Sequence, residues 1–154
     1  MNRMMKLARR PHGMVKPEDF RLEEGPVPEP GEGEVRIKIA YVSLDPAMRG
    51  WVSEGKSYVP PVAIGETMRS YSVGIVDASR NAAFKVGDAV QGVIGVQDYA
   101  ISNGKGLVKV DPAQAPLERW IGGLGMPGWT AYFGLLEVGQ PKAGETVVVS
   151  AASG

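Results

Sequence analysis

Hydrophobic and polar residues alternate along several short stretches of the chain. The clearest alternation covers residues 35–41, where apolar side chains fall on one face and Arg36 and Lys38 fall on the other. A period of two is typical of a β-strand with one buried face. We therefore predict an antiparallel, half-exposed strand here. Its predicted core-facing residues are Val35, Ile37, Ile39 and Tyr41.

Shorter apolar patterns predict further strands on both sides of this one. They cover residues 4–10, 20–24, 68–78, 86–94, 98–102 and 107–110. Gly74 lies inside one of them, where a glycine is typical of a bulge or of a bend in a barrel. Short strands separated by glycine and asparagine turns indicate a small barrel or sandwich. The fold class is therefore predicted to be mainly β.

Three segments break the strand pattern. Residues 48–51 predict a short helical turn, and residues 56–61, which are polar and contain proline, predict an exposed loop. Residues 117–136 have helix-like spacing, with a glycine-rich interruption at 122–128. The interruption fits the pattern G-x-G-x-x-G, but that motif binds phosphate only between a strand and a helix, and a helix is predicted before it. We therefore reject it as a nucleotide-binding fingerprint.

The last predicted strand differs from the others. Residues 146–149 form an apolar, β-branched run after a proline and glycine turn, which is typical of a strand buried in a parallel sheet. Parallel strands need crossover connections, so this strand cannot stand alone. The small residues that follow are where a dinucleotide-binding unit turns into its first helix. We therefore expect the chain to be the front part of a longer protein, cut as its nucleotide-binding domain begins.

Composition excludes several classes of function. The 17 basic and 17 acidic side chains balance, so nothing indicates a nucleic acid or an anionic membrane as partner. The chain has no cysteine, which removes disulfides and cysteine-based metal sites. Its one histidine, His12, lies in a predicted turn and is interpreted as a solvated loop residue. No apolar run approaches membrane-spanning length, so a cytoplasmic protein without membrane contact is the default expectation.

Six stretches together resemble one enzyme family. They read FRLEE at 20–24, SLDPAMRG at 43–50, SYVPPV at 57–62, VQDYAIS at 96–102, GMPGWTAYFGLL at 125–136 and GQPKAGETVVVSAASG at 139–154. They resemble the medium-chain dehydrogenase/reductase superfamily, and within it the zinc-independent branch of leukotriene B4 dehydrogenase, prostaglandin reductase and curcumin reductase. The resemblance implies a GroES-like, partly open β-barrel over residues 1–124, then a linking helix and the first strand of a truncated Rossmann domain over 125–154.

The residues themselves agree with the zinc-independent branch. Zinc alcohol dehydrogenases need cysteine and histidine ligands. Here Ser43 stands near the expected cysteine, and Glu66 is followed by Thr67 rather than histidine. We therefore expect no metal site. Without a Lewis acid, alcohol oxidation fits poorly, whereas reduction of an activated C=C bond needs a hydride donor and stabilisation of the enolate oxygen.

The resemblance also implies a set of site residues. Cofactor contacts fall on Pro46, Met126, Pro127 and Thr130, and on the pyrophosphate turn made of Ala151, Ala152, Ser153 and Gly154. Substrate contacts fall on Met48, Trp51 and Tyr58, with Tyr58 as the catalytic hydrogen-bond or proton donor. The residues allow plainer interpretations: Met126 filling a core gap, Pro127 starting a helix, Thr130 bonding back to its own helix, and Tyr58 half-buried against the barrel.

Two positions depart from the relatives. Ala47 replaces the usual tyrosine after Asp-Pro, and Trp51 replaces an arginine. Substrate shape is therefore not fixed by the resemblance. It implies NADP as cofactor, an α,β-unsaturated ketone or aldehyde as substrate, and a homodimer at full length, with the present residues inactive alone. The alternatives are a quinone reductase and a barrel that acts as a non-catalytic binding module.

Overall fold

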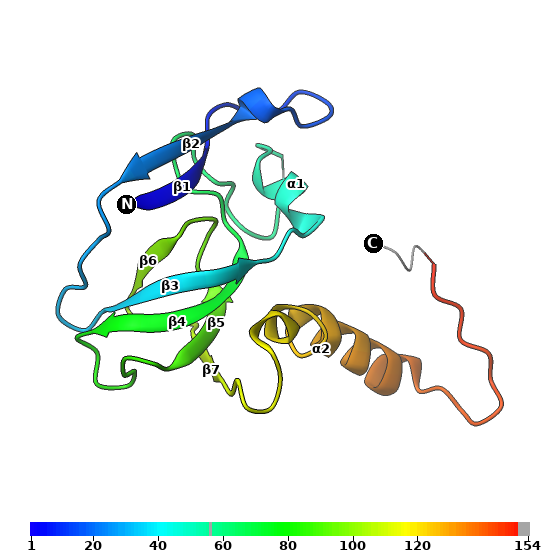
Figure 1. The fold of residues 1–154 in the computed structure, drawn as a ribbon. Helices are drawn as coiled ribbons and strands as arrows, with labels where there is room; N and C mark the ends of the chain where they lie inside the picture. Colours follow the sequence, from blue (N-terminus) through cyan, green and yellow to red (C-terminus); the bar gives the residue numbers. More distant parts are fainter. Residues whose placement is uncertain (56, 151–154) are drawn as a thin grey trace.

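Two antiparallel sheets form most of the structure, a computed structural model that describes residues 1–55 and 57–150 (Figure 1). The small sheet pairs β1 (Asn2–Leu7) with β2 (Phe20–Gly25). The large sheet has the order β6-β3-β4-β5-β7. Its strands are β3 (Val35–Val42), β4 (Tyr71–Ser79), β5 (Ala89–Val93), β6 (Tyr99–Ser102) and β7 (Val108–Val110). The predicted strands within residues 1–110 are therefore confirmed, with ends that differ by up to three residues.

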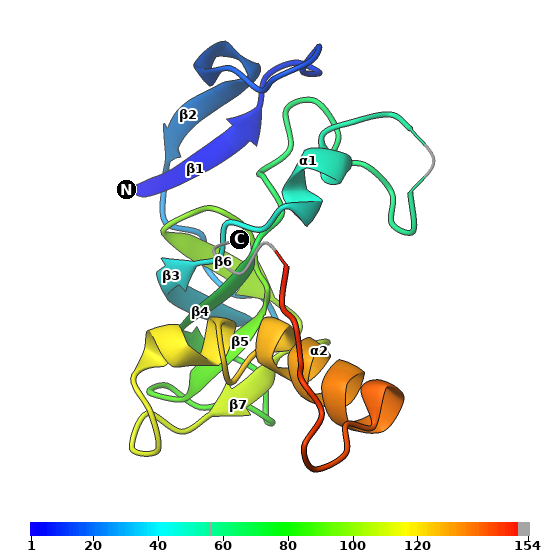
Figure 2. The same ribbon diagram turned by 90° about the vertical axis from the view of Figure 1, so that its right-hand side faces the viewer.

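Short helical segments connect and follow the strands. They are η1 (Pro17–Asp19), α1 (Ala47–Trp51), η2 (Leu117–Ile121), α2 (Met126–Phe133) and η3 (Gly134–Gly139). The predicted helical turn at 48–51 is thus confirmed as α1. Figure 1 shows α1 and α2 to the right of the large sheet, and α1 lies above α2 there and in Figure 2. In the chain, α1 follows β3, whereas α2 follows β7 and η2.

The small sheet is attached to the large one by backbone contacts with two loops. Met4 forms an isolated bridge with Gln97, and Lys6 forms one with Thr67. The backbone N–H of Met5 also donates to the carbonyl of Val96 over 2.9 Å. These contacts join the small sheet to the loops that precede β4 and β6 of the large sheet, as expected for a partly open barrel.

Three apolar clusters form the core. One lies under the large sheet and contains Val35, Ile37, Val76 and Val90. A second joins Val73, Ala89 and Val110 to the side chains of η2. The third fills the space beside the small sheet and contains Leu7, Val52, Val62 and Met68. Each fully buried side chain of this size stabilises the fold by roughly 1.5–3 kcal/mol.

The alternation predicted for residues 35–41 holds only over its first half. Val35 and Ile37 are fully buried, but Tyr41 is 47% exposed. The reason is a bulge: Ile39 pairs with Gly74 and Tyr41 pairs with the next residue, Val73, so Ala40 has no partner in β4. One extra residue shifts a period of two to the other face. The prediction that Tyr41 faces the core is therefore wrong.

Gly74 makes this irregular pairing possible. A β-carbon at this position would lie 2.3 Å from the carbonyl oxygen of Lys38 and 2.9 Å from the Cα of Ile39. No side chain fits such a distance, so β4 must have glycine where β3 bulges toward it. The prediction that Gly74 marks a bulge or bend is confirmed, although the extra residue is on β3.

The region predicted to be helical, residues 117–136, contains different types of helix. Residues 117–121 form a 3-10 helix, and α2 begins only at Met126. The G-x-G-x-x-G pattern at 123–128 therefore follows a helical segment, and its rejection is confirmed. A β-carbon on Gly128 would lie 1.7 Å from the carbonyl oxygen of Gly123, so this glycine is needed where the two segments touch.

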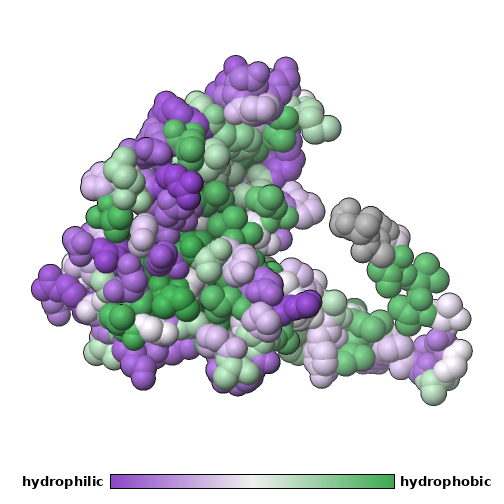
Figure 3. All heavy atoms as spheres, viewed as in Figure 1, coloured by the Kyte–Doolittle hydropathy of each residue, from purple (hydrophilic) through white to green (hydrophobic). Residues whose placement is uncertain are grey.

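Residues 146–149 do not form the predicted strand. They make no ladder with the described residues, and Val148 is 86% exposed. Figure 3 shows hydrophobic surface along the C-terminal arm that leaves the body of the molecule. A strand of this kind needs a parallel neighbour, which the described part of the chain does not supply. The expected pyrophosphate turn at 151–154 lies outside the described residues.

Asp19 fastens the loop between β1 and β2. Its carboxylate accepts a hydrogen bond from Arg9 Nε over 2.8 Å and another from the backbone N–H of Lys16 over 2.8 Å. The bond from Arg9, followed by the bond from Lys16, holds the pKa of the Asp19 carboxyl below its ordinary value. The residue is almost fully buried, and these hydrogen bonds compensate for the burial of its charged carboxylate.

Gly74→Ala is expected to destabilise the fold by about 3 kcal/mol, because the added methyl overlaps backbone atoms that cannot move without breaking the sheet. Urea unfolding of the 154-residue chain measures this loss. Gly50→Ala is the matched control: it meets no atom within 4 Å in α1 and should be neutral or stabilising by up to about 1 kcal/mol. Equal midpoints for the two variants would contradict the packing argument.

Asp19→Asn is expected to lower the urea midpoint at pH 7. Because the folded-state pKa of Asp19 is depressed, its stabilisation is present above the unfolded value of about 3.9 and is lost as pH falls through the lower folded value. The midpoints of the variant and the unmodified chain should therefore converge as pH is lowered from 7 toward 2. Glu18→Gln, at an exposed carboxylate 3.9 Å from Arg9 Nη2, should change little at any pH. A gap that stays constant with pH would refute the assignment.

Candidate functional site

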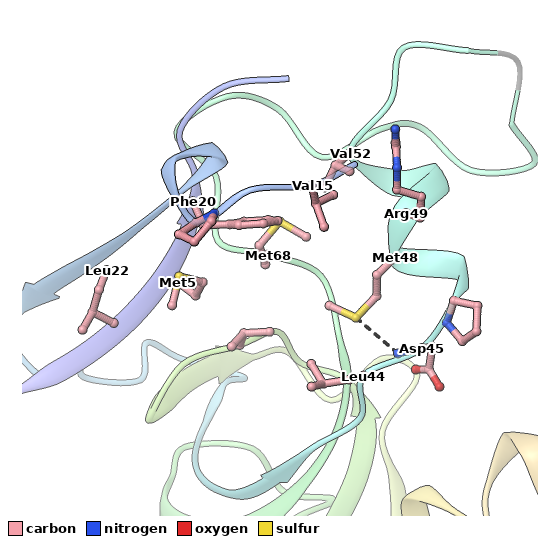
Figure 4. Close-up of a pocket in the computed structure, with 13 residues that line it drawn as sticks. Met5, Val15, Phe20, Leu22, Leu44, Asp45, Met48, Arg49, Val52 and Met68 are labelled. Atoms are coloured by element: carbon pink, nitrogen blue, oxygen red, sulfur yellow. Dashed lines mark hydrogen bonds between the residues drawn. The ribbon is translucent and has the colours of Figure 1, made fainter. Parts of the chain in front are cut away.

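A cavity of about 680 Å³ lies between the small sheet and α1 (Figure 4). We call it the main cavity. The strands of the small sheet contribute Met5, Phe20 and Leu22, and α1 with its flanking residues contributes Pro46, Met48 and Val52. Its volume is within the range of small-molecule sites in proteins.

The wall of the main cavity is almost entirely apolar. Three methionines, Met5, Met48 and Met68, come from three separate segments of the chain. Unbranched thioether side chains adapt their shape to a bound molecule more readily than branched ones. Met68 and Val52 are also members of a buried core cluster, so one side of the cavity is the core itself. The wall therefore suits a hydrocarbon ligand and has a rigid base.

Polar groups lie at the α1 end of the main cavity. The hydroxyl of Ser43 donates to Asp45 Oδ1 over 2.9 Å. The backbone N–H of Asp45 donates to the sulfur of Met48 over 3.4 Å, shown as a dashed line in Figure 4. These two bonds fix the turn that leads β3 into α1, and they set Pro46 and Met48 against the cavity.

The predicted substrate residues separate into two groups. Met48 lines the main cavity, whereas Trp51 and Tyr58 do not. Trp51 packs against the core cluster beside the cavity, and the guanidinium of Arg69 lies 5.4 Å from its ring centroid. Tyr58 is 81% exposed on the loop that follows α1.

The predicted cofactor residues also separate. Pro46 lies in the wall of the main cavity, while Met126, Pro127 and Thr130 lie on the first turns of α2. Met126 is 52% exposed, and the hydroxyl of Thr130 donates to the carbonyl of Met126 over 2.8 Å. Pro127 starts the helix, and Thr130 bonds back to it, as their plainer interpretations suggested. The pyrophosphate residues Ala151, Ala152, Ser153 and Gly154 lie outside the described residues.

A second cavity, of about 260 Å³, lies beside the main one. We call it the side cavity. Its wall includes Tyr41 from the bulged end of β3, and Arg3 and Asp98. Arg3 donates to both carboxylate oxygens of Asp98, through Nε over 2.8 Å and Nη2 over 3.1 Å. The hydrogen bond from Arg3 holds the pKa of the Asp98 carboxyl below its ordinary value, so the pair is ionised near neutral pH.

Sequence reasoning missed most of the cavity wall. The sequence assigns no site role to Met5, Phe20, Leu22, Met68 or Val96, although three of them lie in stretches that carry the family resemblance. Each has the pattern of an ordinary core position. Their convergence depends on how the small sheet folds over α1. No local signal in the sequence gives that geometry.

The described residues contain neither a group of metal-binding side chains nor a membrane-spanning helix. Within residues 1–55 and 57–150, no three acidic, histidine or cysteine side chains are grouped as a metal site would need. In the same residues, no helix is both long and apolar enough to span a membrane.

Comparison with known proteins gives close relatives. The NADPH-dependent curcumin reductase of Escherichia coli (strain K12) is 54% identical over 155 residues, covering 99% of this chain and 44% of that protein. The 2-alkenal reductase (NADP(+)-dependent) of Nicotiana tabacum is 45% identical over 131 residues, covering 83% of this chain and 38% of that protein. This chain thus spans less than half the length of these relatives.

A solved structure agrees with the fold. The crystal structure of CurA in complex with NADPH from Vibrio vulnificus has a TM-score of 0.90 at 47% identity, covering 99% of this chain and 45% of that one. The mainly β fold and the resemblance drawn from the six sequence stretches are both confirmed. Residues 3–110 match the family model described as the N-terminal domain of oxidoreductase. The chain therefore belongs to this family of oxidoreductase N-terminal domains, in the zinc-independent branch of the medium-chain dehydrogenase/reductase superfamily.

Proposed function

We propose that the full-length protein reduces the C=C bond of α,β-unsaturated ketones and aldehydes with NADPH. One observation carries this proposal: the main cavity has an almost entirely apolar wall, with Asp45 and Arg49 at its α1 end, and at that end also lie Pro46 and Met48 from the family's SLDPAMRG motif. The printed names of the relatives, a curcumin reductase and a 2-alkenal reductase that use NADPH or NADP, support the same chemistry.

The residues present fit the proposed cofactor. Met126 is half-exposed at the start of α2, so its side chain is available to a flat nicotinamide ring. Pro127 and Thr130 flank it on the same two turns. When bound, NADPH would supply a hydride for the β-carbon of the substrate, and a proton from a separate donor would complete the reduction at the α-carbon. We propose that residues 125–154 begin the domain that holds this cofactor, after a catalytic domain over 1–124.

The chain's own residues have three tasks in this reaction. Met5, Met48 and Met68 bind the hydrocarbon part of the substrate and exclude water from it. The turn at Ser43 and Asp45 holds Pro46 against the reacting end of the cavity. Exclusion of water matters because a hydrogen bond to a developing enolate oxygen is stronger in a less polar site.

We propose Tyr58 as the donor of that hydrogen bond, and of the proton. Its support is the SYVPPV motif that it shares with the family, and its side chain is exposed on the loop after α1. A hydroxyl of the cofactor and water are the other possible proton sources. A quinone reductase and a non-catalytic binding module remain rival functions, and each predicts a different outcome below.

The full-length protein is expected to oxidise NADPH when an enone is supplied. NADH should not replace NADPH as the hydride donor. Tyr58→Phe should lower kcat by about 100-fold, because it removes the donor and keeps the ring. Tyr99→Phe on β6 is the matched control and should leave kcat unchanged. Turnover with a quinone alone would favour the rival enzyme, and binding without turnover of any acceptor would favour the binding module.

The 154-residue chain alone is expected to be inactive, because the proposed cofactor-binding domain is incomplete in it. NADPH oxidation by the purified chain, assayed beside the full-length protein, measures this. Turnover by the shorter chain would contradict the proposed domain arrangement.

We also propose that the full-length protein is a cytoplasmic homodimer. Light scattering tests its oligomeric state, and cell fractionation tests its localisation.

A further inference from the structure

The backbone that follows Tyr58 has little freedom of its own. Two residues after Tyr58 come Pro60 and Pro61, whose rings fix two successive φ angles at about −65°. The segment ends at Val62, which is 2% exposed and belongs to a buried core cluster. We call residues 58–62 the Tyr58 segment. It is therefore a stiff stretch of chain that is anchored in the core at one end and presents Tyr58 at the other.

Two arginines from other parts of the chain hold the Tyr58 segment by its carbonyl groups. Arg10 Nη1 donates to the carbonyl of Val62 over 2.6 Å, at the end of the segment. Arg69 Nη1 donates to the carbonyl of Pro60 over 3.0 Å, two residues from Tyr58. Of these two hydrogen bonds, the one from Arg69 is nearer to Tyr58 and so constrains its position more directly.

Trp51 in turn fixes the position of Arg69. The guanidinium carbon of Arg69 lies 5.4 Å from the centroid of the Trp51 ring, which is within range of a cation–π interaction. The ring packs against the core cluster that contains Val62, and the backbone N–H of Val62 donates to the Trp51 carbonyl over 2.8 Å. A planar guanidinium held in this way loses little conformational freedom when it binds a carbonyl. Trp51 thus supports the Tyr58 segment directly and through Arg69.

We propose that Arg69 is a positioning residue for Tyr58. With its guanidinium held on Trp51, it fixes Pro60 and so sets where the Tyr58 hydroxyl meets the enolate oxygen. The inference rests on the proposed function, because it takes Tyr58 as the hydrogen-bond and proton donor. Trp51, which lines neither the main cavity nor the side cavity, then acts through Arg69 rather than on the substrate. A displacement of about 1 Å is enough to slow a reaction that depends on such a donor.

Arg69→Met in the full-length protein tests this role, because it removes the hydrogen-bond donor and keeps an unbranched side chain. It should lower kcat with methyl vinyl ketone by about tenfold, while KM for NADPH changes less than about twofold. Arg69→Lys, which keeps the charge and a donor but not the planar group, should lower kcat by only about threefold. Arg80→Met, at an exposed arginine paired with Glu32, is the matched control and should change neither value.

The decisive comparison repeats Arg69→Met in the Tyr58→Phe variant. A residue that acts through the Tyr58 hydroxyl has nothing left to position there, so kcat should fall by less than about a further twofold. The same tenfold loss with and without the hydroxyl would overturn the proposal, because Arg69 would then act independently of Tyr58. An unchanged kcat for Arg69→Met alone would also overturn it.

Hydrogen exchange gives a readout that needs no turnover. In the full-length protein, the amide of Val62 should exchange about threefold faster in Arg69→Met and at the unmodified rate in Arg80→Met, because loss of the bond at Pro60 loosens the Tyr58 segment. Equal exchange in both variants would contradict the attachment. Absence of turnover by the unmodified protein with methyl vinyl ketone would instead count against the proposed function, and the exchange comparison would still decide whether Arg69 holds the segment.

Discussion

The close contact between β3 and β4 at Gly74 determines how the rest of this structure is arranged. Because Gly74 has no side chain, the backbone of β3 can approach it and bulge at Ala40. The bulge turns Tyr41 toward solvent, and β3 then runs into the turn that starts α1. β3 therefore contributes Tyr41 to the side cavity and leads into Pro46 in the wall of the main cavity.

The second determinant is the placement of the small sheet over α1. Two isolated bridges and a tight loop hold this sheet, and Asp19 accepts the hydrogen bonds that close the loop. Several charged side chains of this part of the molecule form ion pairs with near neighbours: Arg3 with Asp98, Lys6 with Glu23 and Arg9 with Asp19. The main cavity, between the small sheet and α1, has an almost entirely apolar wall, so binding there depends on shape and hydrophobic contact.

Sequence periodicity predicted β3 because its first half has one buried face with a period of two. β4 and β5 are buried on both faces, and they were predicted as short apolar runs between turns. Sequence patterns failed at Tyr41, where an unpaired residue shifts the alternation, and at residues 146–149, which have no neighbouring strand among the described residues. The site was harder. Pro46 and Met48 were expected from a family motif, but Met5, Leu22 and Val96 come together only in three dimensions. Nothing local distinguishes a strand residue beside a groove from one in the core.

The central proposal is that the main cavity, beside α1, binds the substrate. The most direct test is a crystal structure of the full-length protein with NADP and octyl ethyl ketone, the saturated product of octyl vinyl ketone. The ketone oxygen should lie near Pro46, and the hydrocarbon arm should lie between Met5, Met48 and Met68. A ketone bound elsewhere, or a main cavity filled by another part of the full-length protein, would contradict the proposal.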